Sequence, residues 1–133
     1  MRFVLDASIA ITWAMRDEDR PLADLALVEL RSGSAIVPGI WWYEIRNILV
    51  LNERRNRISQ GDSEQFLRDL EQLSIEVDFS QSGTQVIDLS RKYKLSVYNS
   101  AYLALAMRDG LPLATLDTDL EAAAIGAGVP LLA

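Results

Sequence analysis

The stretch Phe3-Val4-Leu5-Asp6-Ala7-Ser8 decides the fold of this chain. Its three consecutive apolar residues predict a short strand that is buried on both faces, as the strands of parallel sheets are. This strand ends at a carboxylate. Because open α/β sheets place their sites beyond the carboxyl ends of the strands, Asp6 is expected at such a site. A functional site there requires further polar side chains at the same edge of the sheet.

Short apolar segments alternate with helical segments along the rest of the chain. Further strands are expected at residues 35–37, 75–77, 112–116 and 129–132, the last at an edge of the sheet because it contains Pro130. Helices are expected at residues 9–15, 21–31, 41–56, 61–73, 82–93, 101–108 and 120–125. This alternation predicts an α/β fold with three α/β/α layers, in which helices cover both faces of a central parallel sheet of four to five strands. With no linker or repeat, residues 1–133 are expected to form a single domain.

Several polar residues have helix-capping roles available to them. Ser8 is expected to cap the helix at residues 9–15, and Asn99 or Ser100 the helix at residues 101–108, after an extended segment at residues 95–98. Glu44 is expected in the first turn of its helix, where a carboxylate is favourable by itself. Each of these residues therefore has a structural role available besides any functional one.

The composition restricts the chemistry that the chain can perform. It contains no His and no Cys, which excludes Ser-His-Asp and Cys-His catalysis, His-ligated zinc and disulfides. The formal net charge of −6 argues against a passive nucleic-acid binder. It does not argue against an enzyme that reaches phosphates through a divalent cation, nor against a basic protein partner. No membrane-spanning segment or signal peptide is recognisable, so a cytoplasmic protein without membrane association is expected.

A second carboxylate, Asp117, follows the strand expected at residues 112–116, and Asp119 comes two residues later. Right-handed crossovers would place the strand ends at Asp6 and Asp117 at the same edge of the sheet. Two carboxylates at this edge favour a functional site over two unrelated polar strand ends. Both Asp117 and Asp119 can also cap the last helix, so for Asp119 the two roles remain open.

Four segments carry a resemblance to a known family. They are Val4-Leu5-Asp6-Ala7-Ser8, Trp42-Tyr43-Glu44-Ile45-Arg46-Asn47, Leu95-Ser96-Val97-Tyr98-Asn99-Ser100-Ala101-Tyr102-Leu103-Ala104-Leu105-Ala106 and Leu113-Ala114-Thr115-Leu116-Asp117. Each segment alone is weak evidence. In this order, over essentially the whole chain, they resemble the PIN-domain ribonucleases, specifically the VapC-type toxins of bacterial toxin–antitoxin pairs.

The resemblance implies a metal-dependent endoribonuclease whose acidic pocket binds Mg²⁺, with Mn²⁺ as the alternative ion. The family's four acidic positions match Asp6, Glu44, Asn99 and Asp117, its supporting hydroxyls match Ser8 and Thr115, and an accessory acidic position matches Asp119. Mg²⁺ prefers hard oxygen ligands, and a water bound to it can supply the attacking nucleophile. The implied partners are an RNA substrate, a VapB-like cognate antitoxin whose tail covers the pocket, and a second copy of the chain in a homodimer.

Position 99 departs from the family pattern, which has Asp there. Asn99 keeps a carbonyl oxygen but lacks the negative charge, so weaker metal binding and reduced or abolished cleavage are expected. An introduced Asp→Asn change and natural divergence both account for the residue, and Ser100 in place of the usual Ala indicates some drift. The alternative function is a catalytically inactive PIN-fold module that binds an antitoxin or RNA.

Two further groups of side chains have both a structural and a functional interpretation. The arginines 54, 55 and 57 are expected to form a solvated helix end, with an RNA-phosphate contact as the alternative. The aromatic residues Trp41, Trp42 and Tyr43 are expected in the core or at a dimer contact, with base stacking as the alternative.

Overall fold

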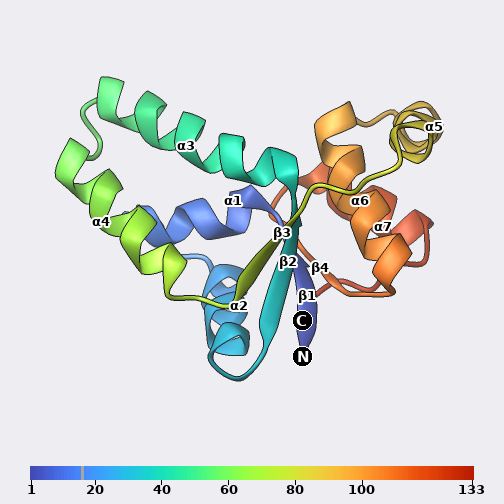
Figure 1. Ribbon diagram of the computed structural model, residues 1–133, viewed down its shortest axis with the longest axis horizontal. Helices are drawn as coiled ribbons and strands as arrows, with labels where there is room; N and C mark the ends of the chain where they lie inside the picture. The colour runs from blue at the N-terminus through green and yellow to red at the C-terminus, as the bar shows by residue number, and fades with distance from the viewer. Residues whose placement is uncertain (16) are drawn as a thin grey trace.

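The central sheet has four parallel strands in the order β3-β2-β1-β4 (Figure 1). The structure is a computed structural model that describes residues 1–15 and 17–133. The strands are β1 (Arg2–Leu5), β2 (Ser34–Pro38), β3 (Ile75–Asp78) and β4 (Leu113–Ala114). The predicted α/β class with a parallel sheet is confirmed.

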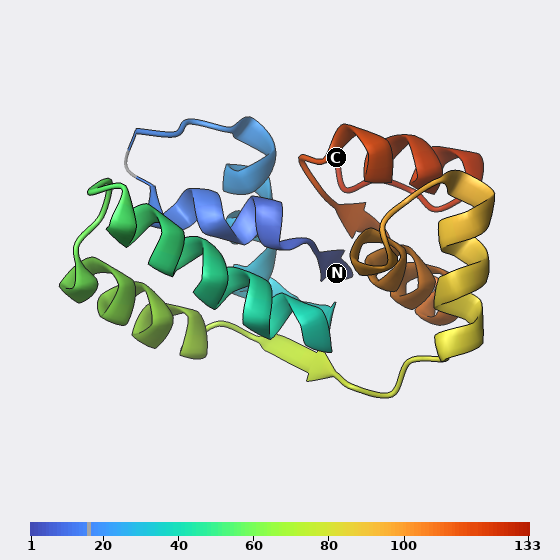
Figure 2. The ribbon, with the colours of Figure 1, turned by 90° about the horizontal axis from the view of Figure 1, so that it is seen from above.

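Helices cover both faces of this sheet, as predicted (Figures 1 and 2). One face carries α1 (Ala7–Ala10), the 3-10 helix η1 (Ile11–Ala14), α2 (Pro21–Ser32), α3 (Gly39–Arg54) and α4 (Gln60–Glu71). The other face carries α5 (Gly83–Tyr93), α6 (Val97–Asp109) and α7 (Thr118–Gly126). Among the residues that the structure describes, no helix is both long and apolar enough to cross a membrane.

The core lies on both sides of β1. Phe3, Val4 and Leu5 are each 0% exposed, because helices cover the two faces to which their side chains point. In α6, every residue from 100 to 106 is buried. A helix that is apolar all round is a buried helix, and α6 lies between the sheet and its neighbours α5 and α7 (Figure 2).

The order of the strands creates a switch point beside β1. The chain adds β2 and then β3 on one side of β1, and it returns later to place β4 on the other side. Val4 pairs with Leu113 and Leu5 pairs with Ala114, so the two strands end level with each other. Open α/β sheets bind their ligands at this kind of position, because connections leave it in opposite directions.

The last two strands are shorter than predicted. Only Leu113–Ala114 forms β4, and the strand expected at residues 129–132 is reduced to one bridge between Leu113 and Leu131. Asp117 therefore lies three residues beyond the end of β4 rather than directly after it. The backbone leaves the sheet there because side-chain hydroxyls take the place of strand partners for the amides of Leu116 and Asp117.

Two predicted helix caps are wrong. Ser8 lies inside α1, and Asp6 is the residue that precedes the helix. Helix α6 begins at Val97, because the Ser96 hydroxyl accepts a hydrogen bond from the amide of Asn99 at 3.0 Å. Residues 97 and 98 are therefore helical rather than extended, and Asn99 is the third residue of the helix. Its side chain is consequently free of the capping role that the sequence suggested.

The start of α3 also differs from the prediction. The helix begins at Gly39, so Glu44 lies in its second turn, where the helix dipole does not explain a carboxylate. Trp41 is 5% exposed and belongs to the core, as expected. Trp42 is 40% exposed and Tyr43 is 63% exposed, so these two side chains lie outside the core, and their expected dimer contact stays a prediction.

The basic end of α3 is remote from Glu44. Arg57 donates hydrogen bonds to both carboxylate oxygens of Asp17 at 3.0 Å, so its guanidinium already has an anionic partner. Arg54 and Arg55 are exposed. A rise of about 1.5 Å per residue puts Arg54 about 15 Å from Glu44 along the helix axis. This geometry favours the solvated helix end over an RNA contact at the expected site.

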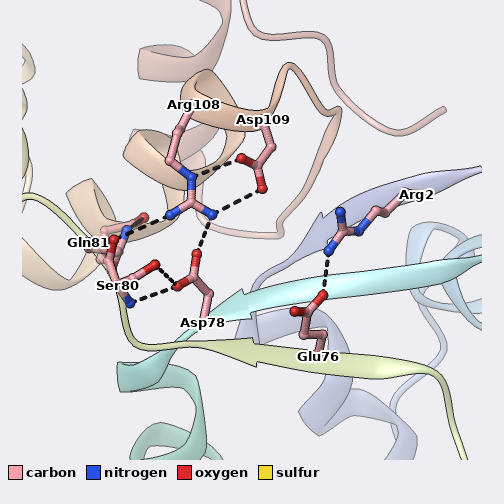
Figure 3. A network of polar contacts seen from close by, with 8 residues as sticks. Arg2, Glu76, Asp78, Ser80, Gln81, Arg108 and Asp109 are labelled. Atoms are coloured by element: carbon pink, nitrogen blue, oxygen red, sulfur yellow. Dashed lines mark hydrogen bonds and ion pairs between the residues drawn. The ribbon is translucent and has the colours of Figure 1, made fainter.

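A network of polar contacts fixes the loop after β3 to α6 (Figure 3). The Arg108 guanidinium pairs with Asp78, at the end of β3, and with Asp109, whose carboxylate lies 2.8 Å away. The side-chain amide of Gln81 donates to the carbonyl oxygen of Ala101 at 2.6 Å. These contacts fix the position of α6 on the sheet. They involve its C-terminal end, whereas Asn99 lies near its N-terminal end.

Candidate functional site

Asp6 is the centre of the candidate site. It follows β1 at the switch point, and it is 5% exposed. Its Oδ2 accepts hydrogen bonds from the hydroxyls of Ser8 and Thr115, each at 2.7 Å. Burial and two hydroxyl donors therefore fix this carboxylate in one orientation.

The two hydroxyls also join the ends of β1 and β4. The Ser8 hydroxyl accepts from the amide of Leu116 at 3.0 Å, and the Thr115 hydroxyl accepts from the amide of Asp117 at 3.0 Å. Each hydroxyl thus donates to Asp6 and accepts from the segment that leads to α7. The supporting role expected for Ser8 and Thr115 has a direct physical reason. Both side chains fix the carboxylate of Asp6 relative to the backbone segment that carries Asp117.

Asp117 lies between α7 and α6. Its Oδ1 accepts from the amide of Leu120 at 2.9 Å and so caps α7, as the sequence allowed. Its Oδ2 accepts from the side-chain amide of Asn99 at 3.3 Å. The carbonyl oxygen of Asn99 takes no hydrogen bond from the residues that the structure describes. Asn99 therefore neutralises none of the charge of Asp117, but it removes the repulsion that a carboxylate at position 99 would add.

Glu44 joins the same group through a residue that the sequence analysis did not single out. The hydroxyl of Tyr102, which is 0% exposed, donates to Oε1 of Glu44 at 2.6 Å and connects α6 with α3. Tyr102 lies one helical turn after Asn99. A tyrosine in a run of buried apolar residues was the available signal, because a buried hydroxyl requires a polar partner.

The electrostatics of these groups are unfavourable without a cation. Burial raises the pKa of Asp6, although hydrogen bonds from Ser8 and Thr115 oppose the shift and the charge of Asp117 adds to it. Burial also raises the pKa of Glu44, with the charge of Asp6 adding to the effect. Among the described residues, no ion pair includes Asp6, Glu44 or Asp117.

This acidic site, defined here as Asp6, Glu44, Asn99 and Asp117, has a donor set suited to a hard divalent cation. Within residues 1–15 and 17–133, no three acidic side chains are close enough to form a complete metal cage. Mg²⁺ does not need one, because it usually keeps several waters and binds one or two carboxylates. Such an ion would stabilise these carboxylates, of which Asp6 is buried and none has an ion-pair partner among the described residues.

Asp119 is not brought into this arrangement. It is exposed in the first turn of α7 and lines a separate hollow with Tyr93 and Lys94. None of the hydrogen bonds or ion pairs among the described residues links it to the acidic site. Asp119 lies only two residues after Asp117, but the first turn of α7 separates the two side chains.

The family of the chain follows from its sequence. A family model for the PIN domain matches residues 3–126, which is nearly the whole chain. The chain therefore belongs to the PIN domain family, as its four sequence segments indicated. Comparison with curated protein sequences gives no match.

Several solved structures share the fold. PAE2754 from Pyrobaculum aerophilum has a TM-score of 0.73 at 21% identity, and the match covers 92% of this chain and 84% of that one. A toxin-antitoxin complex from Klebsiella pneumoniae gives 0.63 at 21% identity and 87% coverage of each chain. VapC20 from Mycobacterium tuberculosis, a toxin that cleaves the sarcin-ricin loop, gives 0.58 at 14% identity, with 92% and 95% coverage. At these identities the likeness establishes the common fold.

Proposed function

We propose that this chain is the toxin of a type II toxin–antitoxin pair, a metal-dependent endoribonuclease whose activity is weakened or lost through Asn99. The observation that carries the proposal is the acidic site, in which Asp6, Glu44 and Asp117 have no ion-pair partner among the described residues. Two structural neighbours, a toxin–antitoxin complex and a toxin that cleaves the sarcin-ricin loop, support the same assignment.

The proposed site residues have distinct roles. Asp6, Glu44, Asn99 and Asp117 would hold Mg²⁺, or Mn²⁺, whereas Asp119, which lines a separate hollow, would not be a ligand. When bound, the ion would lower the pKa of a water and neutralise charge on the phosphate. Ser8 and Thr115 hold Asp6 in place by donating to its Oδ2, and Tyr102 holds Glu44 by donating to its Oε1. Asp6 and Thr115 are buried, whereas Glu44 and Asp117 are partly exposed.

The proposed protein partner is a VapB-like antitoxin. Uncompensated carboxylates attract a basic side chain by the same electrostatics that attract a cation, so a basic antitoxin tail would inhibit the site by filling it. The proposed assembly is a homodimer of the chain, with antitoxin bound to each copy.

Asn99 also gives direct support to a second function, a catalytically inactive binding module. Its amide satisfies Asp117 with a hydrogen bond, so the site tolerates the absence of a metal better than four carboxylates would. Such a module would hold the antitoxin or RNA without cutting.

One paired assay separates the two functions. The chain and its Asn99→Asp variant are incubated with structured RNA in Mg²⁺, in Mn²⁺ and in chelator. We expect the variant to cleave about 100-fold faster than the original chain, because the loss of one preorganised electrostatic group from an active site commonly costs about 10²–10³ in kcat. Chelator should abolish this cleavage.

The matched control carries Asn99→Asp together with Asp6→Asn, and it should be inactive. Cleavage by neither the chain nor the Asn99→Asp variant, on several RNAs and with both proteins folded by circular dichroism, would reject the enzyme. Retained antitoxin or RNA binding would then establish the module.

A further inference from the structure

A hollow of about 360 Å³ opens beside the acidic site, between α3 and α6. Its lining residues are Ile40, Tyr43, Glu44, Asn47 and Tyr98. Because Glu44 belongs to the acidic site, whatever occupies this hollow lies next to the place where the proposed function puts a phosphodiester. The sequence analysis did not identify Asn47 or Tyr98 as functional residues.

Two of the residues that line the hollow are exposed tyrosines. Tyr43 is 63% exposed and Tyr98 is 60% exposed. Within the described part of the chain, neither hydroxyl makes a hydrogen bond. Tyr43 precedes Glu44 in the sequence and Tyr98 precedes Asn99, so the backbone that fixes the acidic site also fixes the two rings. Large aromatic side chains exposed together mark a binding surface.

One of these rings is supported from behind. The ring of Tyr43 packs edge-on against that of Trp42, with 5.0 Å between the ring centroids. The Arg46 guanidinium lies 3.6 Å from the centroid of the Trp42 ring, so the Trp42 ring is itself held in place by a cation–π contact. The ring of Tyr43 is therefore exposed, but its contact with Trp42 restricts its orientation. A ring with a restricted orientation loses little conformational entropy when a flat ligand stacks on it.

The hollow also holds an unpaired amide. Asn47 lies one turn after Tyr43 and Glu44 on the same side of α3, and it is exposed. Its side chain makes no hydrogen bond with the residues that the structure describes. A carboxamide has both a donor and an acceptor, the combination that reads the hydrogen-bonding edge of a nucleobase. Ile40 supplies an apolar wall.

We propose that Tyr43, Tyr98 and Asn47 form a nucleobase subsite, which holds an unstacked base of single-stranded RNA beside the phosphate to be cut. The inference rests on the proposed function and specifies its substrate as RNA with accessible bases. Stacking suits this chain because its net charge of −6 gives it little general attraction for phosphates, whereas aromatic stacking does not depend on charge. The faces of bases within an A-form duplex are covered by the neighbouring base pairs, so duplex RNA should be a poor ligand.

The test measures RNA binding by the chain as it stands, with Asn99 in place. Fluorescence anisotropy of a short labelled single-stranded RNA gives the affinity in Mg²⁺ for the original chain and for Tyr43→Ala, Tyr98→Ala, Tyr43→Phe and Tyr98→Phe. Each Ala variant is expected to bind about 5- to 150-fold more weakly, which is the range for loss of one stacked base. Each Phe variant keeps the ring and should stay within about twofold.

Phe79→Ala is the matched control, since Phe79 is an aromatic residue with 76% exposure that does not line the hollow. It should bind RNA like the original chain. Asn47→Ala should retain most of the affinity and lose discrimination among homopolymers of the four bases.

The remaining outcomes overturn the proposal in distinguishable ways. If RNA binds, or the Asn99→Asp variant cuts it, while both Ala variants behave like the original chain, the subsite is wrong and the ribonuclease stands. If no RNA is bound by the chain and none is cut by the variant, the proposed function fails first. If the Ala variants lose RNA binding together with self-association, measured by light scattering, the tyrosines belong to an interface between copies and the subsite is rejected.

Discussion

Asp6 and Asp78 occupy equivalent positions in the sheet and have opposite surroundings. Each is an aspartate at the carboxyl end of a parallel strand, β1 for Asp6 and β3 for Asp78, with β2 between them. Asp78 accepts from the hydroxyl and the amide of Ser80, at 2.6 and 2.7 Å, and it pairs with Arg108 (Figure 3). Asp6 has two hydroxyl donors and no cationic partner among the described residues.

The pKa values of the two carboxyls differ accordingly. Hydrogen bonds from Ser80, together with the Arg108 guanidinium, hold the pKa of Asp78 below its usual value. The same guanidinium lowers the pKa of Asp109. Burial moves the pKa of Asp6 in the other direction. Arg108 thus compensates the carboxylates of Asp78 and Asp109, whereas the proposed function assigns an external cation to the carboxylates of the acidic site.

Metal binding is expected to show the largest difference between the two regions. In the Asn99→Asp background, Asp6→Asn should weaken Mn²⁺ binding by about 10- to 100-fold, because it removes the central oxygen ligand of the site. Asp78→Asn in the same background should leave the affinity unchanged, since Asp78 already pairs with Arg108. Isothermal titration calorimetry measures both. Equal losses from the two substitutions would show that the acidic site is not the metal site.

Loss of the internal cation is expected to have the next largest effect. Arg108→Met leaves Asp78 and Asp109 without their partner, and the side chain of Asp78 is only 9% exposed. We expect the free energy of unfolding to fall by about 1–2 kcal/mol in urea denaturation. Arg91→Met is the control, because Arg91 and Asp88 form an exposed pair at 3.6 Å. Such pairs contribute about 0–1 kcal/mol. If Arg91→Met lowers the free energy of unfolding as much as Arg108→Met does, the Arg108 network contributes no more than an exposed ion pair.

The smallest expected effect is an increase in the free energy of unfolding. Asp6→Asn should raise the free energy of unfolding at pH 7 by about 1 kcal/mol, as often happens when a functional site is neutralised. A carboxyl with a raised pKa in the folded state binds more protons there than in the unfolded state, so stability declines as the pH rises above 3.8, its ordinary value. The gain from the substitution should therefore be largest at pH 7, decrease as the pH falls towards 3.8 and vanish only below that value.

Thermal unfolding of both proteins in metal-free buffer across this range provides the measurement. The contributions of Asp78 and Asp109 are common to the two proteins and cancel in the difference. A gain that is independent of pH would mean that the charge of Asp6 is not its cause.

Much of this arrangement could be predicted from the sequence. The apolar run at Phe3–Leu5 can be buried on both faces only in a covered sheet, and the alternation of segments then requires helices in both outer layers. The PIN domain was recognisable because its characteristic residues recur at four places in the correct order. Local patterns failed where a side chain competes with the backbone: the amide of Leu116 bonds to the distant hydroxyl of Ser8, and that of Asp117 to the hydroxyl of Thr115, instead of extending β4.

The sequence by itself determined the class of fold, the carboxylates at the switch point and the absence of any histidine or thiol chemistry. Only the tertiary structure decided which carboxylates are already paired, because Arg108 is 30 residues from Asp78 and nothing local links them. The same holds for Tyr102, which reaches Glu44 across 58 residues. Residue types and their periodicity fix where each side chain leaves the backbone, but the partner it meets depends on how distant helices pack.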